Sequence, residues 1–73
     1  MLFHNFNHQL YDIVWIEGPV PSFYRQAKIV LRFVYEGTVY YTLETRNEPD
    51  RILELRDEQN VFLENPYDHR HQD

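Results

Sequence analysis

Histidine is the one reactive side-chain type that the sequence gathers into small clusters. His4 and His8 are four residues apart, so a helical turn would place both on one side. His69 and His71 share the C-terminal tail with two aspartates. Both spacings suit a transition-metal ion, which imidazole and carboxylate groups bind. A metal site also needs rigid neighbours that orient its ligands, whereas both clusters lie at chain ends. We therefore predict no metal site and no cofactor.

The sequence offers no recognisable nucleophile. It has no cysteine, and its only serine, Ser22, follows Pro21, where a turn or a helix cap explains it. Because Gly18 and Gly37 are the only glycines, a glycine-rich phosphate loop is excluded. A chain of 73 residues also leaves little room for the pocket of several hundred Å³ that small ligands usually occupy. We predict that the protein is not an enzyme.

The net charge of −5 is unevenly distributed. Residues 1–46 carry four acids and four bases, whereas residues 47–73 carry eight acids and three bases. Phosphate binding normally requires a basic field, so we do not expect duplex nucleic acid as a partner. The acidic C-terminal third either attracts a basic partner surface or simply keeps the protein surface solvated.

The composition indicates a folded protein of the cytoplasm. Hydrophobic residues make up 42% of the chain and aromatic residues 16%, which excludes a disordered chain. No apolar run approaches the ~18 residues of a transmembrane helix, so we expect no membrane partner. The start of the chain, Met1–Asn5, lacks the basic and apolar stretches of a secretion signal. Without cysteine there are no disulfides of the kind that stabilise small secreted proteins.

Two features of the chain favour a protein partner or a homo-oligomer. Six of the seven bases are arginine and there are six tyrosines, residue types that are enriched at the centres of protein interfaces. The base composition of the genome would explain the arginine bias equally well. In addition, a domain of this size has little net stability of its own, which a second subunit would increase.

Turn-forming residues recur at intervals of about ten residues, which is typical of a small all-β fold. We predict a small antiparallel meander curled into an SH3-like or OB-like partial barrel. Phe3, Phe6 and Leu10 would form a short N-terminal helical turn over one end of it. The domain would span residues 1–66, followed by a polar C-terminal tail of residues 67–73.

The clearest pattern is a β-hairpin made by residues 28–35 and 38–45, which are rich in β-branched and aromatic residues. A three-residue loop, Tyr35–Gly37, with Gly37 in the left-handed region, would set the register. One face would then carry only apolar residues, namely Ile29, Leu31, Phe33, Val39, Tyr41 and Leu43. The opposite face would form favourable cross-strand pairs: Val34 with Thr38, Arg32 with Tyr40, Val30 with Thr42 and Lys28 with Glu44.

A helix is the alternative for the first arm of this hairpin. Ser22 could cap such a helix, and Gly37 could end it. Ile29 and Phe33 would then lie outside its apolar stripe, and the segment is dense in strand-forming residues. We therefore predict a strand.

Residues 51–63 also admit two interpretations. Leu53 and Leu55 alternate with charged residues and precede a polar turn, which indicates a second short hairpin that ends in residues 61–63. The alternative is a helix capped by Asn47, but the polar residues 56–60 leave it without an apolar stripe. We favour the strands.

The outer face of the main hairpin is the predicted binding site. It would consist of an aromatic and aliphatic patch with one cation, bordered by a tryptophan: Val30, Arg32, Val34, Tyr40, Thr42 and Trp15. This patch would meet a protein partner or a second copy of the chain. The competing interpretation is that the sheet curls and covers these residues as part of a second core.

These observations favour a non-catalytic protein–protein interaction module, acting as a subunit, an adaptor or a regulatory inhibitor. One alternative is a single-stranded nucleic-acid-binding barrel, in which Tyr40 and Trp15 would stack on bases beside Arg25 and Arg32. Another is an acidic protein whose C-terminal third mimics nucleic acid and blocks a basic partner.

Overall fold

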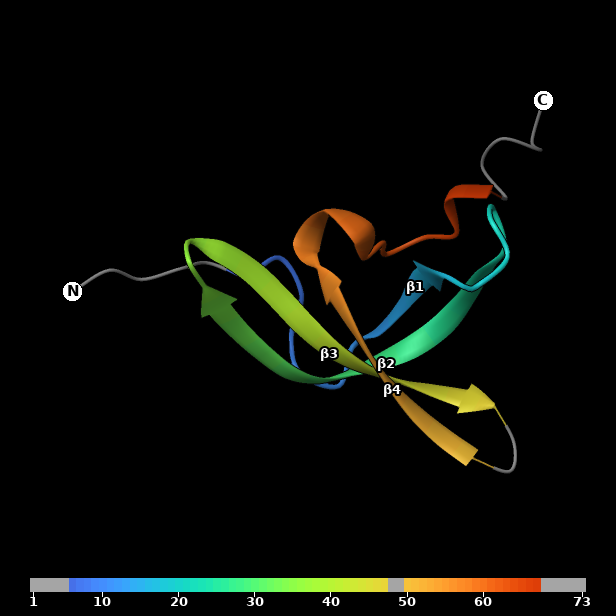
Figure 1. The fold of residues 1–73 in the computed structure, drawn as a ribbon, viewed down its shortest axis with the longest axis horizontal. Coiled ribbons are helices and arrows are strands. Elements are labelled where there is room, and N and C mark those ends of the chain that lie inside the picture. Colours follow the sequence, from blue (N-terminus) through green and yellow to red (C-terminus); the bar gives the residue numbers. More distant parts are fainter. Residues whose placement is uncertain (1–5, 48–49, 68–73) are drawn as a thin grey trace.

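The computed structural model describes residues 6–47 and 50–67, which form a four-stranded antiparallel sheet (Figure 1). The strands follow one another in space as they do in sequence, so the predicted all-β meander is confirmed. A short 3-10 helix, η1, follows the last strand. The elements are β1 (Ile13–Glu17), β2 (Tyr24–Tyr35), β3 (Thr38–Asn47), β4 (Asp50–Asp57) and η1 (Glu58–Asn60).

The sheet does not close into a barrel, so the SH3-like or OB-like part of the prediction is not confirmed. After η1 the chain instead crosses to the far edge of β1. There the Trp15 N–H donates to the Phe62 carbonyl at 2.7 Å, and the Phe62 N–H donates to the Trp15 carbonyl at 3.0 Å. This single bridge lies beside the outer edge of β1, while β4 forms the opposite edge of the sheet.

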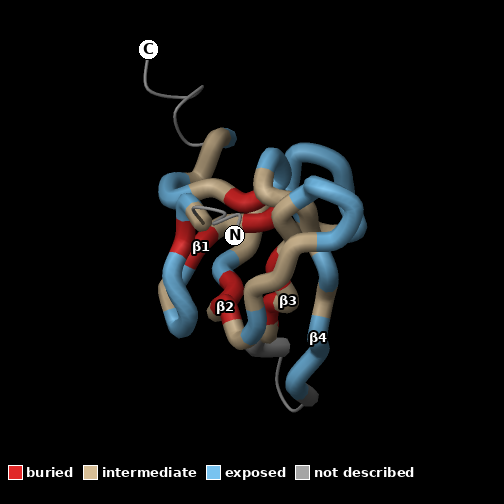
Figure 2. The backbone as a smooth tube through the Cα atoms, turned by 90° about the vertical axis from the view of Figure 1, so that its left-hand side faces the viewer, coloured by how far each residue is buried: buried red, intermediate tan, exposed pale blue. Residues whose placement is uncertain are grey.

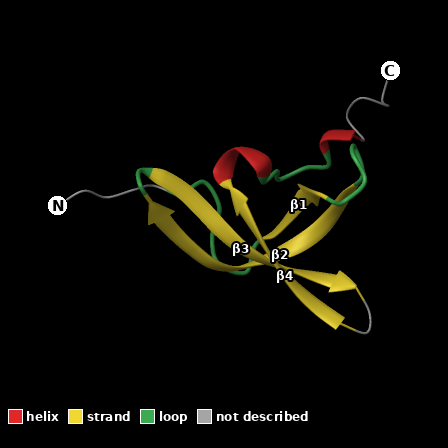
Figure 3. Ribbon diagram, in the orientation of Figure 1, coloured by secondary structure: helices red, strands yellow, loops and turns green. Residues whose placement is uncertain are grey.

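The N-terminal segment differs from the prediction where the structure describes it. Residues 6–12 contain bends and a turn rather than a helix, and the turn is closed by the Asp12 N–H, which donates to the Gln9 carbonyl at 3.2 Å (Figure 3). Phe3 and most of the predicted tail, residues 68–73, lie outside the described residues. Within the described part of the chain, no helix has the length and apolar character needed to cross a membrane.

β2 is the longest strand and is shared between two neighbours. Its residues 24–28 pair with β1, and its residues 27–35 pair with β3. Beyond the shared part, β1 and the first half of β2 diverge from the end of the β3–β4 hairpin (Figure 1). The dense β-branched and aromatic residues of this segment therefore form a strand as predicted, and the helical alternative is wrong.

The buried residues of β1, β2 and β3, red in Figure 2, alternate with more exposed ones, so the core lies on one side of the sheet, here called the inner face. Tyr41 and Leu43 alternate there with outward-facing residues of β3, and both are fully buried, as predicted. The N-terminal segment contributes Phe6, and the segment after η1 contributes Val61. The buried core consists of Val14, Ile16, Ala27, Ile29, Tyr41, Leu43 and Val61, against which Phe6 and Val39 pack.

The β2–β3 hairpin has a two-residue turn, so the predicted three-residue loop is wrong. Tyr35 pairs with Thr38, and the intervening Glu36 and Gly37 have φ values of 49° and 80°. Positive φ at both positions defines a type I′ turn, whose backbone twist matches that of the flanking strands. As a result Arg32, Phe33 and Val34 lie opposite Tyr41, Tyr40 and Val39, which is one residue away from the predicted register.

A β-bulge at Val30 restores the predicted register farther from the turn. Leu31 lies opposite Thr42, whereas Ile29 lies opposite Leu43, so Val30 is an extra residue in β2. On the turn side of the bulge, each side chain of β2 therefore points to the face opposite the predicted one. Leu31 and Phe33 consequently leave the core: Leu31 is 52% exposed and Phe33 stacks on Tyr40.

Residues 51–57 form a strand, but not the predicted second hairpin. β4 pairs along its whole length with β3, from Asn47 opposite Asp50 to Tyr40 opposite Asp57. The expected partner segment, residues 61–63, reaches β1 instead through Phe62. The polar residues before it form η1 and carry the chain across the inner face.

The type I′ turn predicts opposite effects of two substitutions. Replacing Glu36 by Asn should raise the free energy of unfolding by about 0.5 kcal/mol, because asparagine tolerates positive φ better than glutamate does. Replacing Gly37 by Ala should lower it by about 1 kcal/mol, since an added Cβ meets nothing within 4 Å and only the backbone is strained. Urea denaturation followed by circular dichroism measures both changes. Glu36→Gln is the matched control, and equal stability of the Asn and Gln variants would contradict the two-residue turn.

Candidate functional site

The outer face of the sheet is the side opposite the core. Its members are the residues that alternate with the buried positions of each strand. On β1 and β2 they include Ile13, Trp15, Lys28, Leu31, Phe33 and Tyr35. On β3 and β4 they include Tyr40, Thr42, Glu44, Leu53, Leu55 and Asp57.

The centre of this face is apolar and exposed. Leu31, Thr42 and Leu55 form one row across three neighbouring strands. Leu31 and Leu55 are 52% and 53% exposed, and Leu53 is 62% exposed. In the next row, the rings of Phe33 and Tyr40 stack with a centroid distance of 5.5 Å and an interplanar angle of 20°. An apolar patch of this kind is typical of a protein–protein contact surface.

The structure brings together only part of the predicted binding site. Tyr40 and Thr42 lie on the outer face, and Val30 is the half-buried bulge residue next to their row. Trp15 lies on the same face but opposite Gln26, at the end of β2 far from the turn.

Arg32 and Val34 do not lie on the predicted face. The register shift places them opposite Tyr41 and Val39, which belong to the inner face. Their places on the outer face are taken by Leu31 and Phe33. The apolar patch of the outer face therefore carries no arginine at its centre, in contrast to the prediction.

Arg32 instead holds the N-terminal segment against the sheet. Its guanidinium carbon lies 4.7 Å from the centroid of the Phe6 ring, a cation–π contact. Its Nη1 also donates a hydrogen bond to the His8 carbonyl at 3.2 Å. Both contacts are inside the fold, so the role of Arg32 there is structural.

A partly buried polar cluster lies next to this contact. The Tyr41 hydroxyl donates to Glu58 Oε2 at 2.6 Å and accepts a hydrogen bond from the His8 N–H at 3.2 Å. The Asn7 N–H donates to the same glutamate oxygen at 3.0 Å. His8 is buried, and its ring packs against the Tyr41 ring in a T-shaped contact with a centroid distance of 5.3 Å. Through these contacts the cluster ties the N-terminal segment to β3 and η1.

The pKa values of Tyr41 and Glu58 both depart from their ordinary values. Burial, together with the hydrogen bond to Glu58, raises the pKa of Tyr41 to about 12. Burial alone would raise the pKa of Glu58, but the hydrogen bonds from Tyr41 and Asn7 and the nearby His8 lower it instead. Both pKa values thus move away from neutral pH, where general acids and bases work best. An open hollow of about 460 Å³ adjoins His8 and Glu58. The side chains of both residues already contact Tyr41 within the fold.

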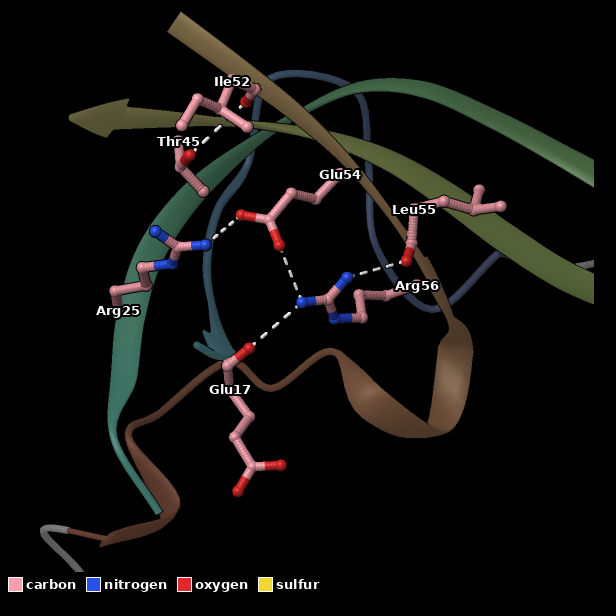
Figure 4. A network of polar contacts seen from close by, with 7 residues as sticks. All are labelled: Glu17, Arg25, Thr45, Ile52, Glu54, Leu55 and Arg56. Atoms are coloured by element: carbon pink, nitrogen blue, oxygen red, sulfur yellow. Dashed lines mark hydrogen bonds and ion pairs between the residues drawn. The ribbon is translucent and has the colours of Figure 1, made fainter. Parts of the chain in front are cut away.

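A second polar network crosses the inner face between β4 and the β1–β2 pair (Figure 4). Arg25 and Arg56 both form ion pairs with Glu54. Arg56 Nη2 also donates to the Glu17 carbonyl at 3.1 Å, which connects β4 to the end of β1. These contacts hold together the two parts of the sheet that diverge beyond the shared segment of β2.

The structure does not build a metal site from the described residues, among which no three His, Cys, Asp or Glu side chains come together. Of the four histidines that suggested metal binding, only His8 lies within the described ranges, and it is buried against Tyr41. A second open hollow, of about 690 Å³, adjoins Arg25, Lys28 and Glu44 where β2 and β3 diverge. Comparisons with family models, with curated proteins and with solved structures give no match for this chain.

Sequence reasoning missed the residues that dominate the outer face, namely Leu31, Phe33, Leu53 and Leu55. The available signal was the pair Glu36-Gly37, since a glycine second in a two-residue turn is typical of type I′ hairpins. With that turn, Phe33 falls opposite Tyr40. The alternation of Leu53 and Leu55 with charged residues already showed that they share one face of a strand.

The Tyr41–Glu58 contact predicts how stability depends on pH. Because the pKa of Glu58 is lowered from its ordinary value of 4.5, its contribution is present above that pH and is lost as the pH falls through the folded-state value. Because the pKa of Tyr41 is raised from 10 to about 12, its contribution is present below pH 10 and is lost between these values. Tyr41→Phe should therefore lower the free energy of unfolding by about 1–2 kcal/mol at neutral pH. It should lower it less at acidic pH, where Glu58 is protonated, and at alkaline pH, where Tyr41 ionises.

Urea denaturation at acidic, neutral and alkaline pH tests this expectation. Tyr40→Phe is the matched control, since Tyr40 lies on the outer face and donates to no carboxylate within the described residues. A Tyr41→Phe variant that lost the same stability at every pH would contradict the assigned role of Glu58.

Proposed function

We propose that this protein is a non-catalytic protein–protein interaction module of the cytoplasm whose outer sheet face binds a protein partner. The observation that carries the proposal is the row Leu31–Thr42–Leu55 with its two exposed leucines, Leu53 beside it and the stacked Phe33–Tyr40 pair in the next row. Such a module would act as a subunit, an adaptor or a regulatory inhibitor.

The layout of the outer face supports this proposal. Its leucines are more than half exposed, so covering them with a partner would remove apolar area from water. Phe33 and Tyr40 already stack on each other, so binding would cost little side-chain entropy at this pair. Charged residues lie at the margins, with Lys28 opposite Glu44 on one side and Asp57 on the other. An apolar centre with a polar rim is the usual anatomy of a protein interface.

The nucleic-acid alternative has less support. It would place two cations, Arg25 and Arg32, beside the stacking aromatic side chains. Both lie on the inner face instead, where Arg25 contacts Glu54 and Arg32 contacts Phe6. On the outer face, Lys28 lies opposite an acid, Glu44. The proposed mimicry of nucleic acid is similarly weakened, because Glu54 and Glu58 are engaged in contacts within the fold.

A double substitution at the exposed row tests the proposed face. Leu31→Lys combined with Leu55→Lys should leave the fold intact, because both side chains are about half exposed, and should weaken partner binding by roughly tenfold or more. The measurement is affinity capture with the purified protein as bait, quantified by mass spectrometry. Val20→Lys, at a position 62% exposed outside the sheet, is the matched control.

A photo-crosslinking amino acid at Thr42, in the centre of the row, should react with the same partner, whereas one at Val20 should not. A partner that is retained by the double variant and lost with Val20→Lys would contradict the proposal.

Titration with a single-stranded oligonucleotide at low salt distinguishes the proposed protein-binding face from a nucleic-acid-binding face. Tight binding that depends on Tyr40 would favour the nucleic-acid-binding face.

A further inference from the structure

The free edge of β4 is a surface distinct from the outer face. β4 pairs with β3 on one side and is the last strand of the sheet on the other. Arg51 to Arg56 contain no lysine, proline or bulge, the devices that commonly prevent an edge strand from pairing with another chain. The charges of this strand on the inner face, Glu54 and Arg56, neutralise each other in an ion pair. The edge is therefore suited to strand addition.

The residues that present their backbone groups at this edge follow from the register. Tyr35 and Thr38 flank a two-residue turn, so they exchange both backbone hydrogen bonds. Alternation along β3 then directs the backbone N–H and C=O groups of Thr38, Tyr40 and Thr42 toward β2. The backbone groups of residues 39, 41, 43 and 45 point the other way, toward β4. The β4 residues opposite positions 41, 43 and 45 are residues 56, 54 and 52, and their backbone groups form hydrogen bonds with β3. The backbone groups that point to the free edge belong to Arg51, Leu53, Leu55 and Asp57. One of them, the Leu55 carbonyl, also accepts a hydrogen bond from Arg56 Nη1 of its own chain at 2.9 Å, which leaves its second lone pair for a further donor.

These four residues also share the outer face, and their order is self-complementary. Read along β4, the side chains are a cation, two leucines and an acid. If a second β4 runs antiparallel about a twofold axis at Glu54, Arg51 lies opposite Asp57 of the second copy, and Leu53 lies opposite Leu55. Opposite charges and apolar pairs are both favourable across antiparallel strands.

The axis position at Glu54 is compatible with the charges of the inner face. The two copies of Glu54 would lie opposite each other, which would be unfavourable for bare carboxylates. Each Glu54, however, already forms ion pairs with Arg25 and Arg56 of its own chain (Figure 4). The two Glu54 side chains would therefore face each other with their negative charges already balanced by arginines of their own chains.

We propose that two copies of this chain join along β4 into one continuous antiparallel sheet, with Arg51 opposite Asp57 and Leu53 opposite Leu55 of the second copy. This inference rests on the backbone edge and the charge order of β4, and it does not depend on whether the outer face binds a partner. In such a dimer the two outer faces lie side by side and form one larger apolar surface.

Charge reversal tests the pairing. Arg51→Asp places two pairs of like charges across the dimer, and Asp57→Arg does the same with the opposite sign. Each single variant should therefore dimerise on the order of tenfold more weakly than the unaltered protein in sedimentation equilibrium. The double variant Arg51→Asp with Asp57→Arg restores both pairs and should dimerise as the unaltered protein does.

Mixing the two single variants sharpens the test. Arg51→Asp carries acids at both positions and Asp57→Arg carries bases at both, so each mixed pair is complementary. The mixture should form a heterodimer although neither variant alone dimerises well. An unaltered protein that sediments as a monomer up to high micromolar concentration, or single variants that dimerise undiminished, would overturn the proposal.

Cysteine substitution measures the register without changing any charge. It also keeps the proposal testable if Asp57→Arg fails to fold, since the Asp57 carboxylate accepts a hydrogen bond from the Asn60 side chain. The chain has no cysteine, so Leu53→Cys and Leu55→Cys each carry a single thiol. Residues directly opposite in an antiparallel ladder are about 5.5 Å apart at Cα, which a disulfide spans. Oxidation of the mixture should give the 53–55 heterodimer in preference to either homodimer. Predominant 53–53 or 55–55 dimers would overturn the register.

The outcomes for edge and face are separable. Leu31→Lys with Phe33→Lys alters the face on β2, which β3 separates from β4, and should leave dimerisation unchanged. If this variant loses its partner but keeps the dimer, both proposals stand. If the charge-reversed variants stay dimeric while this variant becomes monomeric, the self-association runs through the face and the edge proposal fails.

Discussion

One extra residue in β2, Val30, determines which side chains meet the core. On one side of this bulge, Ile29 lies opposite Leu43, and both are fully buried. On the other side, the type I′ turn requires Tyr35 opposite Thr38, a register one residue different. Since a one-residue shift turns every side chain to the other face, only a bulge allows the turn and the core to coexist in one strand.

The bulge also explains why Arg32 lies on the inner face. Turn-proximal β2 positions on the inner face include Arg32, which the N-terminal segment covers with Phe6 and the His8 carbonyl. At the opposite end, where β1 and β4 diverge, Arg25 and Arg56 meet on Glu54. These half-buried charges have partners, which offsets the cost of removing them from water. Among the described residues, these polar contacts thus supplement an apolar core of seven buried side chains.

Local patterns made the fold class predictable, whereas the registers between strands were not. Strand-forming residues and regular turn spacing sufficed for the antiparallel meander and for Ile29, Tyr41 and Leu43 as core residues. The loop length of the hairpin was not determined by apolar pairing, because a three-residue loop gave the more uniform apolar face. The structure instead accepts Leu31 and Phe33 outside. Contacts such as Tyr41–Glu58 join distant segments and have no periodic signal in the sequence.

The two proposed surfaces follow from the same asymmetry of the sheet. The N-terminal segment, η1 and the chain after it all cover the inner face, so the outer face has no cover from the described residues, and at the edge of β4 the Leu55 carbonyl accepts a hydrogen bond from the Arg56 side chain. β1 has Phe62 beside its own edge, which leaves β4 as the longer exposed ladder. Because Leu53 and Leu55 belong both to this edge and to the outer face, strand addition at β4 and docking on the face would enlarge one apolar surface rather than compete for it.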